Sequence, residues 1–441
     1  MLNYHMKKNI KKPIILGGGL AGLSARYHSQ GIIYEKNSFP GGHARSHNDN
    51  GFVFDEGIHV LHTKSKYVLE LLEKIGANLQ FKERDAWIVS HGAMTRYPFQ
   101  ANTYGLPTDI VKDCLIGFIE NDFTQTDKIK NYQDWTYYMF GKGIAEHFMI
   151  PYSKKFWGVD PKLLTTDWVN VRHPRPTLDE VITGAIQDQS KRFGINGNYR
   201  YPETYGFGNI AESLENASEG EIHYNMEVSK INVDDKYIEF NNSRKVEYDE
   251  VLSSLPLPHL ISLIPNAPKE VISASKKLRT NSIFVVNIAI NRANITKKNW
   301  IYFLEKEYSF IRVSFPFNQS DNMAPKGTST ISAEIAYGND NPLEKNKEKL
   351  VKKVIEDLIK TKIINKSDEI IYTKTIDVKL GYVIFDKDRR PAINLIHNYL
   401  KSKRILPFGR YGLWAYLWSD EAILSGKKVV DQYNKMIIND Q

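Results

Sequence analysis

Three glycines near the start of the chain have the spacing of a phosphate-binding turn. Gly17, Gly19 and Gly22 follow an apolar run at residues 13–16 and open a segment predicted to be helical, residues 20–29. Glycine permits the tight turn and a close approach of the backbone to a pyrophosphate, and the free N–H groups of the helix start favour its charge. The sequence therefore predicts a dinucleotide site.

Glu35, at the end of the next predicted strand, supports this prediction. Its carboxylate can accept hydrogen bonds from both hydroxyls of a ribose and would repel a 2′-phosphate. Glu35 follows Gly22 by 13 positions, so the first helix and its loop are predicted to be about one turn shorter than is usual for this fold.

Two further glycine and arginine segments could contact the same ligand. Gly41, Gly42 and Arg45 follow Glu35 in the pattern E-K-x-x-x-x-G-G-x-x-R, and residues 408–412 read F-G-R-Y-G before a predicted helix. Together these segments resemble the extended fingerprint of a flavoprotein group that holds amine oxidases, protoporphyrinogen oxidases, phytoene desaturases and UDP-galactopyranose mutases.

This resemblance implies FAD as the cofactor. Gly41 and Gly42 would bring backbone N–H groups to its diphosphate, and Gly409 and Arg410 would lie against the flavin and its ribityl chain. Val228 falls where the group has a valine on the adenine side.

The middle of the chain resembles the UDP-galactopyranose mutase branch of the group. Residues 57–63 are similar to G-x-H-x-F-H-T, which would place His59 beside the isoalloxazine. Residues 148–158 are similar to F-x-x-x-Y-T-x-K-x-W-G, which implies a nucleotide pocket that contains Phe148, Tyr152 and Trp157.

The same resemblance implies two arginines for a diphosphate. Arg172 would reach it from a mobile loop, and Arg312, followed by the acidic Glu334, would reach it from a strand. Fork-shaped guanidinium groups are suited to bidentate contacts with phosphate. Tyr205, Tyr382 and Tyr416 would add neutral donors around the sugar phosphates, although any one of these residues alone could equally be a packing or surface residue.

The implied reaction is pyranose/furanose isomerisation of a nucleoside-diphosphate sugar for surface polysaccharide biosynthesis. Reduced FAD would supply N5 as the nucleophile at the anomeric carbon, so NAD(P)H or another reductant would be required. The first alternative is net oxidation of the protoporphyrinogen oxidase or amine oxidase type, favoured by Trp414 and Trp418 around Tyr416. The second is a flavoprotein that binds FAD and a partner without turnover. The nucleotide, the sugar and the oligomeric state stay open.

These segments span the whole chain, so the predicted fold is α/β with a discontinuous Rossmann-type FAD-binding domain, an inserted helical domain and a mostly antiparallel sheet substrate domain. The FAD-binding domain is predicted at residues 12–65, 195–265 and 375–437. The helical domain with the mobile loop is predicted at 66–90 and 105–194, and the sheet domain at 91–104 and 266–374. Asn341-Pro342 is predicted to open an amphipathic helix.

Composition excludes several other classes. The net charge is +8, but Lys and Arg alternate with Asp and Glu along most of the chain, which argues against nucleic acid. Cys114 is the one cysteine, so no intrachain disulfide forms and a reducing, cytoplasmic location is expected. No apolar run reaches the roughly 18–20 residues of a membrane span, and no metal site is predicted.

Overall fold

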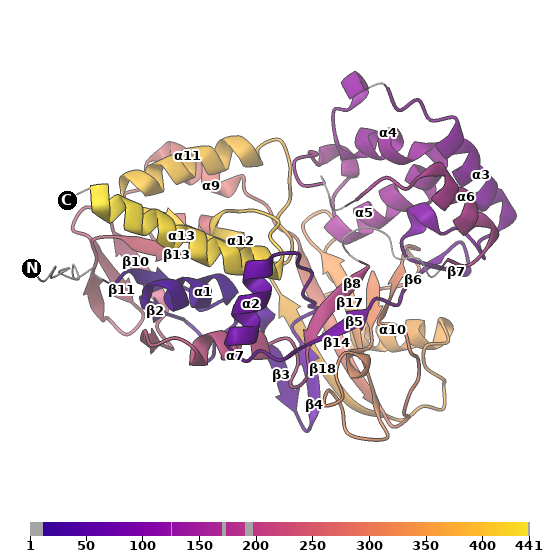
Figure 1. Ribbon diagram of the computed structural model, residues 1–441, viewed down its shortest axis with the longest axis horizontal. Coiled ribbons are helices and arrows are strands. Elements are labelled where there is room, and N and C mark those ends of the chain that lie inside the picture. The colour runs from indigo at the N-terminus through magenta and orange to yellow at the C-terminus, as the bar shows by residue number, and fades with distance from the viewer. Residues whose placement is uncertain (1–11, 125, 170–172, 190–196, 440–441) are drawn as a thin grey trace, which may run out of the picture.

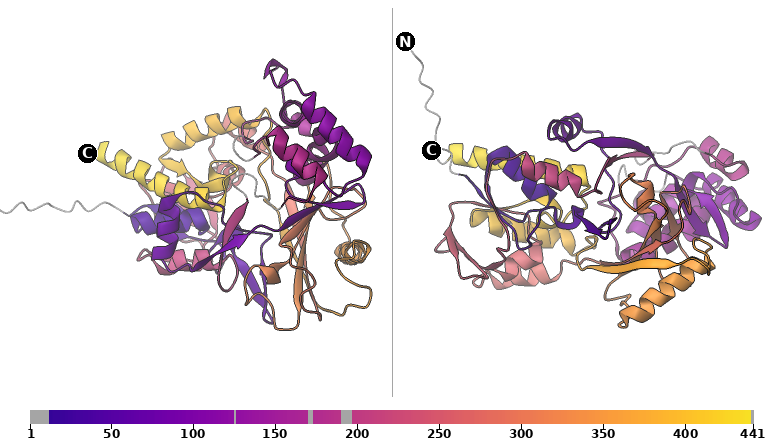
Figure 2. Two further views of the ribbon diagram at one scale, coloured as in Figure 1. Left: turned by 45° about the vertical axis from the view of Figure 1, so that its right-hand side comes forward. Right: turned by 90° about the horizontal axis from the view of Figure 1, so that it is seen from below.

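The computed structural model describes residues 12–124, 126–169, 173–189 and 197–439. One lobe holds a parallel sheet together with residues 12 and 439, the ends of the described chain, and the other holds a large mixed sheet with a group of helices at its far end (Figure 1). In both further views the helices between residues 108 and 186 stay at the end remote from the C-terminus (Figure 2).

The first lobe is built on a five-stranded parallel sheet assembled from distant segments. Its order is β19 (Ile405–Pro407), β13 (Val251–Ser253), β1 (Ile14–Leu16), β2 (Ile32–Tyr34) and β9 (Ile222–His223). The residues of the central strands β1 and β13 are all buried, and all except Ser253 are apolar, because the strands are covered on both faces. Its helices are α1 (Leu20–Ser29), α2 (Lys66–Lys74), α7 (Asn209–Asn216), α8 (Leu257–Ser262), α9 (Lys269–Lys276), α11 (Arg389–Ser402), α12 (Gly409–Gly412) and α13 (Ser419–Asn439).

Glycines allow the short connections and close contacts of this lobe. The shortened link after α1 turns at Gly31, where a Cβ would lie 2.7 Å from the carbonyl oxygen of Pro13. Helices α1 and α13 cross at Gly426, where a Cβ would lie 2.3 Å from the carbonyl oxygen of Ala21. The first helix is therefore short but still packs fully against its neighbours.

Small antiparallel ribbons flank the first lobe. The sheet of β10 (Val228–Asn232), β11 (Tyr237–Phe240) and β12 (Lys245–Glu247) extends it, while β3 (Ser46–Asp49) pairs with β4 (Phe52–Asp55) and β5 (Leu79–Glu83) pairs with β8 (Asn198–Pro202). Residues 221–230 thus divide between β9 of the parallel sheet and β10 of this ribbon.

The second lobe contains a seven-stranded sheet that is antiparallel except between β15 and β6. Its order is β18 (Ile370–Val378), β14 (Ser282–Ile290), β17 (Ser329–Tyr337), β16 (Arg312–Ser314), β15 (Trp300–Phe303), β6 (Ala86–Ser90) and β7 (Ala93–Arg96). Helix α10 (Lys347–Lys360) covers one face through Leu350, Val354 and Leu358. It begins six residues after the predicted Asn341-Pro342 start, at an Asn346 side chain that caps the N–H of Lys349.

The helical part of the second lobe is compact and apolar inside. It comprises α3 (Thr108–Ile119), α4 (Tyr132–Ile144), the π-helical turn η4 (Ala145–Met149), α5 (Ile150–Trp157) and α6 (Leu178–Ile186). Gly117, Gly141 and Gly143 let α3 and α4 cross in near-backbone contact.

The predicted fold class is confirmed, but the boundaries of the helical part differ from the prediction. Residues 66–90 were expected to belong to it, yet α2 packs on α13 of the first lobe, β5 pairs with β8, and β6 joins the large sheet beside β15. The reason is that strand partners far away in sequence decide where these short segments lie. Among the described residues, none of the helices combines the length and the apolar character that crossing a membrane requires.

Substituting Gly22 by alanine tests the turn between β1 and α1. A Cβ there would lie 1.9 Å from the carbonyl oxygen of Gly17, so the turn must open. We expect the free energy of unfolding to fall by about 1–3 kcal/mol and dinucleotide binding to be lost. The control is Gly338→Ala, where a Cβ meets nothing within 4 Å and denaturant unfolding should be unchanged.

Candidate functional site

Two glycine turns face each other at the carboxyl end of the parallel sheet. The N–H of Gly41 donates to the carbonyl of Gly18 at 2.8 Å, and a Cβ on Gly42 would lie 3.4 Å from the Cα of Gly19. Gly17 and Gly41 both have positive φ angles, which side chains disfavour. This bare backbone beside the first turn of α1 fits a dinucleotide pyrophosphate.

Glu35 holds the first turn and lies near the predicted adenine side. Its Oε2 accepts the N–H of Gly18 at 2.7 Å, and its Oε1 accepts the backbone and side-chain N–H groups of Asn37. The carbonyl of Glu35 accepts from Met226, two residues before the buried Val228. The shortened link after Gly22 therefore leaves Glu35 beside the glycine turn.

Gly409 and Arg410 begin α12 next to α1. A Cβ on Gly409 would lie 2.9 Å from the Cβ of Ala21, so this residue must be small. The Nη1 of Arg410 donates to the carbonyl of Leu417 at 3.3 Å, but Nε and Nη2 are buried without a hydrogen-bond partner among the described residues. A buried cation with unused donors indicates a place for an acceptor group of a ligand, and a flavin and its ribityl chain fit this requirement.

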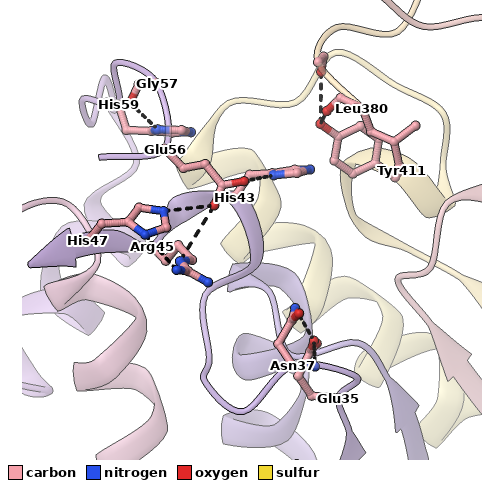
Figure 3. A network of polar contacts seen from close by, with 11 residues as sticks. Glu35, Asn37, His43, Arg45, His47, Glu56, Gly57, His59, Leu380 and Tyr411 are labelled. Atoms are coloured by element: carbon pink, nitrogen blue, oxygen red, sulfur yellow. Dashed lines mark hydrogen bonds and ion pairs between the residues drawn. The ribbon is translucent and has the colours of Figure 1, made fainter. Parts of the chain in front are cut away.

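Three basic side chains converge on Glu56 between the glycine turns and His59 (Figure 3). His43 lies 2.9 Å from its Oε1, while His47 and Arg45 lie 3.6 and 3.8 Å from its Oε2. Burial opposes ionisation of Glu56, yet the hydrogen bonds and charges of His43 and His47 lower its pKa to about 2. Arg45 also stacks on the ring of Phe39 at 3.7 Å, so its guanidinium is already engaged by protein groups.

His59 lies in a loop that joins the first lobe to the large sheet. The N–H of Ile58 donates to Oε1 of Glu334 at 2.7 Å, and the ring of His59 stacks on Phe207 with centroids 5.5 Å apart. Burial lowers the pKa of His59 to about 4, and burial together with Arg84 lowers that of His62 to about 4. Both rings are therefore neutral at pH 7.

Arg312 and Glu334 form a cross-strand ion pair on β16 and β17. Nη2 and Nε of Arg312 lie 2.5 and 2.7 Å from Oε2 of Glu334, whose side chain is only 4% exposed. Burial opposes the charge on Arg312, but Glu334 raises its pKa above the usual value. The Nη1 edge makes no hydrogen bond with the described residues, which leaves it available to a ligand.

Tyrosines surround the two guanidinium groups. The rings of Tyr382 and Tyr416 are 5.8 Å apart, and each lies 5.1 Å from the guanidinium carbon of Arg410. Tyr152 meets Tyr302 edge-on at 5.6 Å, and Tyr302 lies 6.0 Å from the guanidinium carbon of Arg312. Burial raises the pKa values of Tyr152 and Tyr382, so these phenols are neutral donors.

Three residues of this cluster were missed in the sequence. The guanidinium carbon of Arg84 lies 3.9 Å from the ring centroid of Tyr97, and its Nη2 lies 3.4 Å from the hydroxyl of Tyr302. The rings of Tyr97 and Tyr302 have centroids 5.5 Å apart. Tyr302 lies opposite Arg312 in the strand register, which no local pattern announces. For Tyr97 a signal was available, because residues 97–102 (Y-P-F-Q-A-N) resemble a proline-Phe-Asn stretch of the UDP-galactopyranose mutases.

The other predicted substrate residues lie in different surroundings. Phe148 is buried and stacks on Tyr152 with ring centroids 5.3 Å apart, and Trp157 is buried and meets Tyr382 and Tyr416 edge-on at 5.7 and 5.8 Å. Tyr205 is 60% exposed in a turn and makes no ring contact with a described aromatic residue. Arg172 lies outside the described residues.

The arrangement is suited to an anionic ligand held by cations and neutral phenols. Arg312, Arg410 and Arg84 supply positive charge, and the tyrosines supply hydroxyl donors around them. Among residues 12–439 that are described, no group of three or more His, Cys, Asp or Glu side chains could hold a metal ion.

Replacing Arg410 by alanine should weaken cofactor binding. The variant removes the buried Nε and Nη2 donors, so we expect affinity for FAD to fall at least about tenfold. The measurement is titration of the flavin-free protein with FAD by fluorescence quenching. Arg390→Ala is the control, because Arg390 is exposed and pairs with Asp167; an equal loss there would contradict the assignment.

The two histidines predict a pH dependence of stability. Their pKa values near 4 lie below the value of about 6.5 in an unfolded chain, so unfolding takes up protons between these limits. Stability of the flavin-free protein should therefore fall as pH drops from about 6.5 to 4. His59→Gln should lower the proton uptake on unfolding by about one, and addition of His62→Gln by about two, as measured from unfolding free energies across this range.

Comparisons with known proteins agree with this geometry. Residues 23–375 match the model of the flavin-containing amine oxidoreductases. A crystal structure of reduced UDP-galactopyranose mutase is similar with a TM-score of 0.91 and 25% identity, over 97% of this chain and 94% of that one.

Two more distant structures share the fold. A putative protoporphyrinogen oxidase from Exiguobacterium sp. 255-15 has a TM-score of 0.75 and 16% identity, over 96% of this chain and 98% of that one. The fatty acid isomerase of P. acnes that produces CLA has a TM-score of 0.65 and 12% identity, over the same shares. Since the family model covers most of the chain, the protein belongs to the flavin-containing amine oxidoreductases, and its fold is that of UDP-galactopyranose mutase.

Proposed function

We propose that the protein is a pyranose/furanose mutase of a nucleoside-diphosphate sugar that uses FAD in its reduced form. The observation that carries this proposal is the convergence of Arg312 and Arg410 with Tyr152, Tyr382 and Tyr416. A diphosphate is the substrate group that needs several cations and hydroxyl donors together. The likeness to reduced UDP-galactopyranose mutase supports uridine diphosphate as the nucleotide part.

Mutase chemistry requires that the diphosphate leave the sugar, stay bound and return. The fork of Arg312 is kept in place by Glu334, so its Nη1 edge is ready without reorganisation. Tyr382 and Tyr416 add neutral hydroxyls, which hold a phosphate less tightly than further cations would. Reduced flavin, when bound, supplies the nucleophile for the anomeric carbon.

His59 and the buried phenols of Tyr152 and Tyr382 are uncharged near neutral pH. The imidazole of His59 is neutral, and its Nδ1 faces the carbonyl of Gly57 at 3.1 Å, which fixes the ring. We propose that His59 orients the cofactor ring and does not shuttle protons during turnover.

The proposal extends to Arg172, which lies outside the described residues, and to Tyr205, which is exposed in a turn. Arg172 would be the second diphosphate arginine, and Tyr205 would approach the sugar phosphates when substrate binds. NAD(P)H or a comparable reductant would keep the flavin reduced in the cytoplasm, and the product would serve surface polysaccharide synthesis.

Net oxidation of the protoporphyrinogen oxidase or amine oxidase type is the alternative. One of the two tryptophans that favoured it, Trp414, is 2% exposed, and its carbonyl accepts hydrogen bonds from Arg389. Trp414 therefore packs the interior, whereas Trp418 lies against His62 with ring centroids 5.7 Å apart. A cluster that contains three guanidinium groups also disfavours an apolar or cationic substrate.

The reaction class is tested with the holoenzyme reduced by dithionite under anaerobic conditions. Incubation with uridine, guanosine and thymidine diphosphate sugars should yield a product of unchanged mass and new retention time for one of them. The oxidised enzyme should be inactive. Bleaching of oxidised flavin by a substrate without dithionite would instead establish net oxidation.

Arg312→Lys should lower kcat/KM at least about hundredfold while flavin content stays at the wild-type level. Lysine keeps the charge beside Glu334 but loses the fork. Alanine is a poorer probe, because an unpaired buried Glu334 would destabilise the fold by about 3–5 kcal/mol. The matched control is Arg292→Lys, which alters a bidentate pair with Asp368 away from the site and should leave kinetics unchanged.

A further inference from the structure

Lys155 lies on α5 between Tyr152 and Trp157, two of the three aromatic residues of this helix. It follows Tyr152 by about one helical turn and precedes Trp157 by two residues. Its neighbour Lys154 is exposed to solvent, whereas Lys155 is largely covered by the β15–β16 hairpin. The two lysines therefore differ in surroundings although they are adjacent in sequence.

The ammonium group of Lys155 ties the helix to this hairpin. Nζ donates to the carbonyl of Phe303 at 3.0 Å and to that of Glu305 at 2.8 Å. Phe303 directly follows Tyr302, and its own N–H donates to the carbonyl of Ile311, the residue before Arg312. One peptide segment thus connects Lys155 to both site residues of the hairpin.

This placement costs free energy that a solvent-exposed lysine would not cost. Burial lowers the pKa of Lys155 to about 8, and the carboxylates of Glu305 and Asp357 only partly oppose this effect. A charged amine is retained in a partly apolar place where a shorter uncharged side chain would pack without desolvation. We therefore attribute to the Lys155 side chain a role in positioning α5 relative to the hairpin, and not a gain in stability.

We propose that Lys155 is a positioning residue for nucleotide binding, which fixes Tyr152 on α5 relative to Tyr302 and Arg312 on the hairpin. This inference rests on the proposed function, because it concerns the nucleoside-diphosphate end of the same site. Tyr152 and Tyr302 meet edge-on at 5.6 Å, and such a contact is sensitive to a small shift of either element.

The face of these strands opposite to Arg312 and Glu334 has room for a larger side chain at position 155, so Lys155 can be substituted without obstructing the site. A cavity of about 200 Å³ adjoins Lys155 and is lined by Ile311 and Ile335. Side chains alternate along a strand, so these two residues point away from the face that Arg312 and Glu334 occupy. The cavity offers room for a guanidinium group, so Lys155→Arg can keep both hydrogen bonds.

The test compares three variants of the full-length holoenzyme. Lys155→Met removes the donors at similar length, Lys155→Arg restores them, and Lys154→Met is the matched control on the exposed side of α5. Binding of uridine diphosphate is measured by calorimetry, and kcat and KM are measured with the nucleotide sugar that the reduced enzyme converts. Flavin content and the unfolding midpoint are recorded for each.

We expect Lys155→Met to weaken uridine diphosphate binding about tenfold and to raise KM similarly, with kcat within about threefold of wild type. Lys155→Arg should recover most of the affinity, and Lys154→Met should match wild type. If Lys155→Met does not accumulate as folded holoenzyme, Lys155→Gln, which keeps one donor, should show an intermediate loss.

The outcomes separate this inference from the proposed function. A wild-type enzyme that binds no nucleoside diphosphate would refute the proposed function itself. Wild-type affinity in Lys155→Met, or a loss of kcat and flavin equal to the loss of affinity, would overturn the positioning role while leaving the mutase proposal intact.

Discussion

The buried carboxylate of Glu334 is the constraint on which the site depends. It accepts from Arg312 on the neighbouring strand and from the N–H of Ile58 in the loop that carries His59. A carboxylate that is 4% exposed is tolerable only when such partners satisfy it, so the two lobes must meet in one relative position. The loop that carries His59 and the large sheet are thereby held in a fixed relative position before any ligand binds.

Around this pair the site combines cationic arginine side chains with the neutral hydroxyl groups of tyrosines. Burial keeps Tyr152 and Tyr382 protonated, while Arg410 and Arg84 add charge at the margins. Under the proposed function, such an arrangement would bind the diphosphate through many moderate contacts, which suits a group that must depart and return. The same fold occurs in a putative protoporphyrinogen oxidase, so the lining of the pocket, and not the fold, distinguishes one chemistry from another.

The hydrogen bonds of Lys155 and the ion pair of Glu334 with Arg312 both hold the β15–β16 hairpin. Glu334 pairs across the strands with Arg312, and Lys155 holds the carbonyl that follows Tyr302. The β15–β16 hairpin, α5 and the loop that carries His59 are each fixed by a charged group that is largely buried. Small displacements of these elements are therefore costly. The preorganised Nη1 edge of Arg312 follows from this arrangement.

The sequence by itself determined the glycine turns, the order of the elements and the fold class, because each depends on residues close together along the chain. Gly17 to Gly22 and Glu35 lie within one strand-turn-helix-strand unit, where local backbone sterics decide the outcome. Only the tertiary structure decided that β6 joins the large sheet, that Phe148 and Trp157 are buried against the tyrosines, and that Tyr302 and Arg84 border the site. These facts follow from strand register and from packing between segments about two hundred residues apart, such as residues 84–97 and 300–302, and no local pattern encodes such pairings.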